Sequence, residues 1–250
     1  MGGVRILIVQ PSKSDPPGPL GEWLAVAGAE VDVVLPAEQS LPADFSEHQG
    51  LVVLGGEMGV YDDPTHPWLA EVRALLSKAV SERVPTLAVC LGAQLLAAAT
   101  GGQVRPARNG PEAGTLLIAK RDVAAEDPLF GPVPLTPDVL QSHSDEVAVL
   151  PPSAQLLASS PKCDNQLFRV GDCAYGMQFH IETTTDLVLE WAELSPEIAA
   201  AIRPGQLERA HLDAFHVDMA ETWRPVAERF VRFVGTPPED RKASRFLPLA

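Results

Sequence analysis

The chain has 250 residues, of which 46% are hydrophobic and 21% are charged, and its formal net charge is -14. This length and composition allow one large buried core. The acidic balance argues against a general nucleic-acid surface, which needs clustered lysine and arginine to neutralise phosphates. The sequence shows neither a signal-peptide pattern nor an apolar stretch of the roughly 20 residues that a membrane span needs. We therefore expect a cytoplasmic protein without nucleic-acid or membrane partners.

The first part of the chain alternates strand-like and helix-like segments. Short aliphatic runs bounded by glycine and proline are typical of buried parallel strands, and they occupy residues 5–10, 30–35, 50–54 and 85–89. Residues 20–29 and 67–83 have the apolar spacing of helices. This alternation predicts an α/β fold with a doubly wound, mostly parallel sheet covered on both faces.

From Thr115 onwards the pattern changes to shorter strand-like pieces and then to helices. Strands that we expect to add antiparallel pairs to the sheet occupy residues 115–119, 155–159, 165–170 and 174–179. Helical patterns occupy residues 185–193, 206–215 and 223–234. We therefore predict a domain over residues 1–194, followed over residues 195–250 by a helical extension packed on the core and a frayed tail.

The three cysteines, Cys90, Cys163 and Cys173, form no CxxC pair and have no metal-ligand spacing. The sequence therefore predicts no disulfide framework, no metal site and no cofactor. Cys163 and Cys173 are best interpreted as buried strand thiols, because a free cysteine packs as a small hydrophobic residue.

Cys90 stands where an apolar strand ends and an Ala/Leu-rich helix begins. At such a nucleophile elbow the side chain projects above the sheet, and the free N–H groups of the new helix favour a thiolate. Gly92 leaves room for a sharp turn, and the Leu91 N–H can face a developing oxyanion. The alternative is an inert core cysteine at a strand end.

His180 and Glu182 follow the strand-like run that begins at Ala174. In an extended chain, residues i and i+2 point to the same face, so Glu182 can reach one ring nitrogen of His180. That contact would fix the tautomer and leave the other nitrogen to take a thiol proton. The alternative is a structural histidine, because the spacing alone does not bring His180 to Cys90.

Two loops complete the candidate site. Gly55 and Gly56 follow the third strand, so they open at the same sheet edge as Cys90, and their N–H groups can approach a substrate oxygen closely. The Gly-x-Gly-x-x-Gly pattern of phosphate loops is missing, and an ordinary turn is the alternative. The polar run at residues 142–146 reads by itself as a solvated loop.

The order of these motifs resembles that of the class I (triad) glutamine amidotransferases, in particular their stand-alone, GMP synthase-like members. The most specific pieces are Val89-Cys-Leu-Gly-Ala-Gln94 and Gly176-Met-Gln-Phe-His-Ile-Glu182, and the likeness extends over roughly residues 5–193. The resemblance implies a flavodoxin-like sheet. It also implies cleavage of glutamine through a γ-glutamyl thioester, with release of glutamate and ammonia.

The same resemblance assigns roles by position. It makes Cys90 the nucleophile, His180 the base and Glu182 the third member of a catalytic triad. The oxyanion-hole donors are the backbones of Gly56 and Leu91. The implied substrate-binding residues are Gly55, Gln94, His143, Ser144 and Asp145, with the backbone serving at the last two.

Three positions depart from the family pattern. Glu57 stands where proline often follows the double glycine, Ile181 replaces the usual proline between histidine and glutamate, and Thr115 stands where tryptophan is frequent. None of these departures removes a triad member. Glu57 bears on the native substrate, because an acidic group there would disfavour a free carboxylate or attract a cation.

Three functional hypotheses follow. The first is a glutaminase that supplies ammonia to a separate synthetase subunit, because nothing in the chain resembles an ATP-binding synthetase domain. The second is a stand-alone hydrolase of γ-glutamyl amides, which needs no partner. The third is a non-catalytic binding protein on the same fold, since fold does not fix function.

Overall fold

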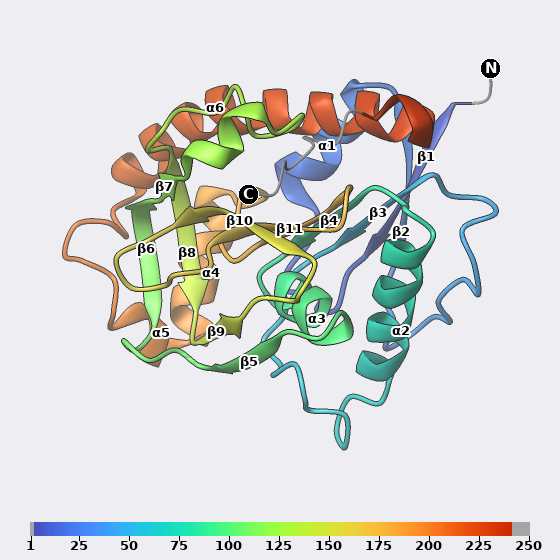
Figure 1. Cartoon of the computed structure of the whole chain (residues 1–250). Coiled ribbons are helices and arrows are strands. Elements are labelled where there is room, and N and C mark those ends of the chain that lie inside the picture. The colour runs from blue at the N-terminus through green and yellow to red at the C-terminus, as the bar shows by residue number, and fades with distance from the viewer. Residues whose placement is uncertain (1–2, 242–250) are drawn as a thin grey trace, which may run out of the picture.

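An eight-stranded sheet lies at the centre of the computed structural model, which describes residues 3–241 (Figure 1). Its parallel strands are, in spatial order, β2 (Ala29–Val34), β1 (Val4–Val9), β3 (Gly50–Val53), β4 (Thr86–Val89) and β12 (Ala174–Met177). The sheet continues antiparallel through β11 (Leu167–Val170), β10 (Ala154–Ser159) and β7 (Ala119–Lys120). The parallel part has the 2-1-3-4-5 order of flavodoxin-like folds, so the predicted fold class is confirmed.

Helices cover both faces of this sheet (Figure 1). On one face, α2 (Trp68–Ser81) and α3 (Leu91–Ala99) pack against Leu7 and Val9 of β1. On the other, α1 (Gly18–Val26) and α6 (Arg209–Gly235) pack against Ile6 and Ile8. The strands are thus buried on both sides, which explains why they read as continuous aliphatic runs.

Two short antiparallel ribbons lie beside the main sheet. One pairs β6 (Glu112–Leu117) with β8 (Asp138–His143), and the other pairs β5 (Gln103–Pro106) with β9 (Asp145–Val149). The expectation of a solvated loop at residues 142–146 is therefore wrong, because this run contains the end of β8 and the start of β9. His143 and Glu146 are buried there, while Ser144 is exposed in the turn between the two strands.

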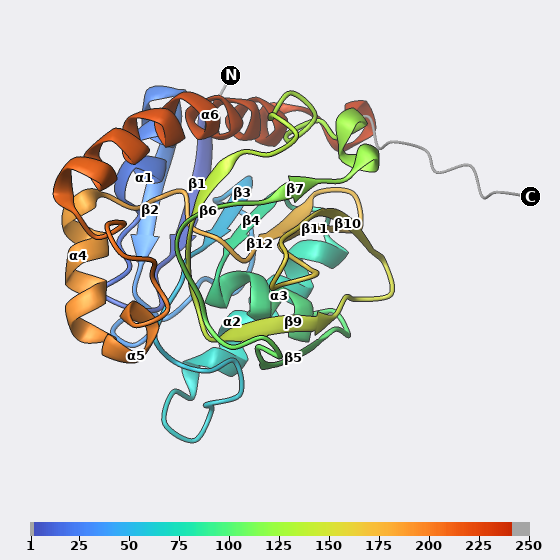
Figure 2. The same cartoon turned by 90° about the vertical axis from the view of Figure 1, so that its left-hand side faces the viewer.

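The C-terminal helices belong to the same core as the sheet. The two helical patterns at residues 206–215 and 223–234 merge into α6, whose Trp223 and Phe230 are fully buried. Figure 2 shows α4 (Thr185–Leu194) and α5 (Pro196–Ala199) beside the start of α6. The packing on the core agrees with the expectation, while the domain boundary at residue 194 stays a prediction.

Short 3-10 helices occupy residues 122–126 and 238–240. The end of the predicted frayed tail, residues 242–250, lies outside the described residues. Within residues 3–241, no helix combines the length and apolarity that crossing a membrane requires.

Candidate active site

Cys90 occupies a strained turn between β4 and α3. Its backbone has φ 50° and ψ -109°, a positive φ that a residue with a side chain rarely adopts. Its N–H donates to the Met177 carbonyl at 2.7 Å, which ties the turn to β12. Such a sharp strand-to-helix turn is typical of nucleophile elbows. The thiol lies 3.8 Å from the Ser142 carbonyl and is 7% exposed.

Gly92 allows α3 to start this close to the sheet. A methyl group at Gly92 would lie 2.2 Å from the Val53 carbonyl oxygen, a distance that excludes any side chain. The helix N-terminus is therefore held directly behind Cys90, where its unpaired N–H groups and positive dipole end favour a thiolate.

His180 and Glu182 form a buried pair. The His180 Nδ1 lies 2.6 Å from Glu182 Oε1, and the two side chains are 2% and 0% exposed. Burial by itself would lower the pKa of His180, but the charges of Glu182 and of the neighbouring Cys90 outweigh it and hold that pKa well above its ordinary value. Glu182 thus favours the imidazolium, as a base that accepts a thiol proton requires.

Among the described residues, His180 Nε2 has no hydrogen-bond partner. Because Nδ1 is turned to Glu182, Nε2 is the nitrogen left for proton transfer. The pair was expected at a strand end, but β12 stops at Met177 and His180 instead forms an isolated bridge with Leu140 of β8. The expected contact between the two side chains nevertheless forms, although the chain bends on both sides of His180 instead of continuing as a strand.

Ile181 contributes its backbone to the same pair. Its N–H donates to Glu182 Oε2 at 2.8 Å, so both oxygens of the buried carboxylate are engaged. A proline at this position would have no N–H to donate. The departure from the family pattern therefore adds a hydrogen bond that orients Glu182.

The double glycine loop lies against the same centre. A methyl group on Gly55 would lie 3.2 Å from His180 Cε1 and 3.6 Å from Cys90 Cβ, so this glycine lies directly against both side chains. A methyl group on Gly56 would lie 3.0 Å from Leu91 Cδ2, which places the two predicted oxyanion-hole residues side by side. A cavity of about 350 Å³ opens above them, and its wall includes Gly56, Cys90 and His180.

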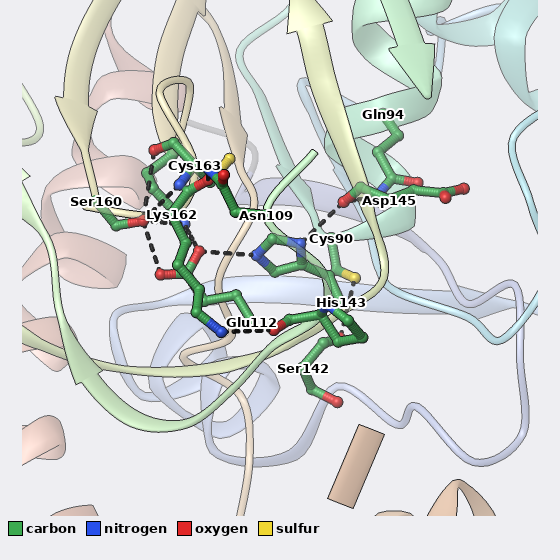
Figure 3. A network of polar contacts seen from close by, with 12 residues as sticks. Cys90, Gln94, Asn109, Glu112, Ser142, His143, Asp145, Ser160, Lys162 and Cys163 are labelled. Atoms are coloured by element: carbon green, nitrogen blue, oxygen red, sulfur yellow. Dashed lines mark hydrogen bonds and ion pairs between the residues drawn. The ribbon is translucent and has the colours of Figure 1, made fainter. Parts of the chain in front are cut away.

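On the α3 side of Cys90, three predicted substrate-binding residues contact one another (Figure 3). Gln94 Nε2 donates to the Asp145 carbonyl at 3.3 Å, and His143 Nδ1 donates to the same oxygen at 2.8 Å. Gln94 and His143 are buried, while the neighbouring Ser144 is exposed. The turn between β8 and β9 is thereby fixed beside Cys90, although these side chains do not line the cavity.

A buried carboxylate supports this turn from behind (Figure 3). Glu112 is 2% exposed and accepts hydrogen bonds from Ser160 Oγ and Gln166 Nε2, each at 2.7 Å. His143 Nε2 lies 3.4 Å from Glu112 Oε2. A buried charge needs such partners to remain ionised. The sequence pattern alone gave no signal for this role of Glu112.

The other two cysteines differ from Cys90. Burial raises the pKa of Cys163 to about 12 and that of Cys173 to about 11, so both are thiols near neutrality. All three cysteines are free. No cluster of three or more histidine, cysteine or acidic side chains within residues 3–241 is arranged to hold a metal ion.

Two residues that the sequence patterns did not single out lie beside His180. Asp15, in the loop after β1, lines the cavity, and Trp191 of α4 packs edge-on against His180 with ring centroids 4.8 Å apart. The place of Asp15 could have been predicted from the sequence, because its loop follows a parallel strand at the edge of the sheet where such folds bind ligands. Trp191 carried no signal beyond its place in a predicted helix.

A strained cysteine at a strand-to-helix turn and a buried histidine–glutamate pair lie together at the carboxyl edge of a flavodoxin-like sheet, the arrangement expected of an amidotransferase-type hydrolase. The family model for glutamine amidotransferase class-I matches residues 21–187. The chain therefore belongs to the class I glutamine amidotransferases.

The relatives of this chain fall into more than one functional class. The chain is 30% identical over 162 residues to gamma-glutamyl peptidase 4 of Arabidopsis thaliana, covering 64% of this chain and 62% of that one. It is 33% identical over 144 residues to the glutamine-hydrolyzing GMP synthase of Flavobacterium psychrophilum, covering 57% and 26%. The matched region thus spans less than two thirds of these relatives. A glutamine amidotransferase structure from Thermotoga maritima superposes with a TM-score of 0.79 at 26% identity, covering 92% of this chain and 99% of that one.

Proposed function

We propose that this protein cleaves the γ-amide of glutamine through a γ-glutamyl thioester on Cys90, releasing glutamate and ammonia. The observation that carries the proposal is the His180 ring, which bonds Glu182 through Nδ1 and leaves Nε2 unpaired beside the cavity that it shares with Cys90. A nucleophile, a base and an orienting carboxylate are the parts that acyl transfer needs.

In the proposed reaction, the Cys90 thiol gives its proton to His180 Nε2, and the thiolate attacks the γ-carbonyl carbon. The N–H groups of Gly56 and Leu91 stabilise the oxyanion. The C–N bond then breaks as His180 returns the proton to the leaving nitrogen. Water, deprotonated by His180, attacks the thioester, and glutamate leaves with the thiol restored.

The α-amino and carboxylate groups of the substrate would lie toward Gly55, Gln94 and the backbones of Ser144 and Asp145. The hydrogen bonds of Gln94 and His143 to the Asp145 carbonyl support this assignment, because they fix the turn in advance of binding. We assign His143 an indirect part, since its two ring nitrogens face Asp145 and Glu112.

Two versions of this function differ in the fate of the released nitrogen. The kinship with a GMP synthase favours ammonia delivery to a separate synthetase subunit. The kinship with a gamma-glutamyl peptidase, and a cavity of about 350 Å³ beside Cys90, favour the second version, a stand-alone hydrolase of γ-glutamyl amides with larger leaving groups.

Glutamate release from glutamine and from γ-glutamyl alkylamides, with and without cell extract, tests the function. Stimulation of glutamine cleavage by extract supports ammonia delivery, and full turnover of an alkylamide by the purified protein supports the stand-alone hydrolase. If neither substrate is cleaved and a diazoketone analogue of glutamine leaves Cys90 unmodified, a non-catalytic role on the same fold replaces both.

A further inference from the structure

The cavity beside Cys90 has an acidic side. Asp15 and Glu57 line it, and the only nitrogen-bearing ionisable side chain among its described lining residues is the triad histidine. The neighbouring Lys13 is ion-paired with Glu38 rather than turned to Glu57. The cavity therefore presents two carboxylates to whatever enters it, without a lysine or arginine to neutralise them.

Asp15 is built into this wall. Its side chain is 8% exposed, and the one hydrogen bond it receives among the described residues, from Ser14 Oγ at 3.3 Å, goes to Oδ1. A methyl group on Gly55 would lie 2.7 Å from Asp15 Oδ2 and 3.2 Å from His180 Cε1, so the carboxyl and the imidazole flank one point. An oxygen of a largely buried carboxylate, without a donor among the described residues and close to the reacting centre, is suited to a donor supplied by the substrate.

The loop that carries Asp15 is held in place from α4. Trp191 Nε1 donates to the Ser14 carbonyl at 2.8 Å, while the indole packs on His180. Desolvation by burial raises the pKa of Asp15 to about 6, so the group is ionised near neutrality, although burial disfavours the charge. A cationic partner would offset the free-energy cost of burying this charge.

The rest of the wall suits a short alkyl chain. Trp191, Leu194 and Ile198, from α4 and the short helix after it, provide apolar surface next to the carboxylates. The groups assigned to the glutamyl moiety, around Gln94 and Asp145, do not line this space. Ammonia needs little room, so the cavity has space for a leaving group that is larger.

We propose that this cavity binds the leaving group of a γ-glutamyl amide whose amine carries a second, positively charged nitrogen, and that Asp15 and Glu57 bind that charge. The inference rests on the proposed hydrolase function and names its substrate class, γ-glutamyl conjugates of diamines. The amide C–N bond breaks, the leaving nitrogen takes the proton from His180, and the free diamine departs. Water then hydrolyses the Cys90 thioester to glutamate.

The test compares two substrates of equal length, the γ-glutamyl amide of 1,4-diaminobutane and that of n-pentylamine. They share the glutamyl group and differ only in a terminal ammonium against a methyl group. We expect the purified protein to have at least a tenfold higher kcat/KM for the charged amide. In the Asp15→Asn/Glu57→Gln double variant, that ratio falls toward one.

Glu190→Gln is the matched control, because Glu190 is an exposed carboxylate on α4 that does not line the cavity. It should keep the ratio of the unmodified protein.

A ratio near one in the unmodified protein, with both amides cleaved, would overturn the inference and leave the hydrolase function standing. A ratio that survives in the double variant would remove Asp15 and Glu57 from the recognition of the cation. Failure to cleave glutamine and both amides would contradict the hydrolase function itself.

Discussion

The two sides of Cys90 differ in how their polar groups are satisfied. On the Gln94 side, Gln94, His143 and Glu112 are bonded to one another or to the backbone, and the turn at Asp145 is fixed before any substrate binds. On the Asp15 side, a largely buried carboxylate lines an open cavity. A prearranged wall suits a group that every substrate shares, and an open wall suits the group that distinguishes one substrate from another. In the proposed function, substrate recognition is therefore divided between a fixed side for the shared glutamyl group and an open side for the leaving group.

The largest effect is expected at the centre that both sides share. Cys90→Ala removes the nucleophile, and we expect glutamate release to fall by about 10⁴-fold or more, because the members of a triad act as a unit. Steady-state glutamate release measures this loss. Cys163→Ala is the matched control, since its buried thiol lies outside the cavity. Equal losses in both variants would mean that the effect arises from damage to the core.

Asp15→Asn tests the open side of the site through the pH dependence of the free energy of unfolding. Burial raises the pKa of Asp15 from its ordinary 3.8 to about 6, so above pH 6 the folded protein holds a desolvated charge that the unfolded chain hydrates freely. The variant should therefore be more stable than the unmodified protein by up to about 3 kcal/mol near pH 8. This advantage should shrink as the pH falls through 6 and vanish below about 4.

Urea unfolding at these three pH values measures the difference in the free energy of unfolding. Asp164→Asn, which replaces an exposed carboxylate, serves as the control and should show no such trend. A gain at Asp15 that stays the same at every pH would contradict the account of a buried charge.

Glu112→Gln loosens the prearranged side. The amide keeps the size of the side chain but loses the charge that Ser160, Gln166 and His143 surround. We expect the free energy of unfolding to fall by about 2 kcal/mol, and the KM for glutamine to rise several-fold with a smaller change in kcat. Chemical denaturation and steady-state kinetics measure both, with exposed Glu47→Gln as the control. Unchanged stability and KM would show that the turn at Asp145 does not depend on this network.

Ile181→Pro gives the smallest effect. It deletes the N–H that donates to Glu182 Oε2 at 2.8 Å, a bond to a charged group worth about 1.5 kcal/mol. We expect kcat to fall roughly tenfold if the whole of that energy orients Glu182. Ile181→Val retains the N–H and should keep most of the activity. If valine lowers kcat as much as proline does, packing of this fully buried side chain is the cause instead.

Much of the fold could be predicted because its strands are short, buried and bounded by turn residues. The four runs that begin near Arg5, Glu30, Gly50 and Pro85 became parallel strands in the expected layers. The ribbon strands β8 and β9 could not be predicted in the same way. Their inward-facing residues include Gln141, His143 and Glu146, and a polar pattern does not distinguish a buried network from a solvated loop.

The residues of the site also differ in whether they could be predicted from the sequence. The strand-to-helix turn at Cys90 and the contact between His180 and Glu182 could be predicted, because each depends on residues close together in the sequence. Asp15 and Trp191 could not, because their relation to His180 depends on contacts between segments far apart in the chain. Of the three family departures, Thr115 gained a tertiary explanation of this kind, since its hydroxyl lies 2.8 Å from His211 Nε2 on α6.

The most direct test of the central claim is to trap the covalent intermediate. Acid quenching during turnover of glutamine, followed by digestion and mass spectrometry, should find a glutamyl group on the peptide that contains Cys90. The same treatment of Cys90→Ala should find none. Glutamate release without a label on that peptide, or with the label on Cys163 or Cys173, would contradict the assignment of Cys90 as the nucleophile.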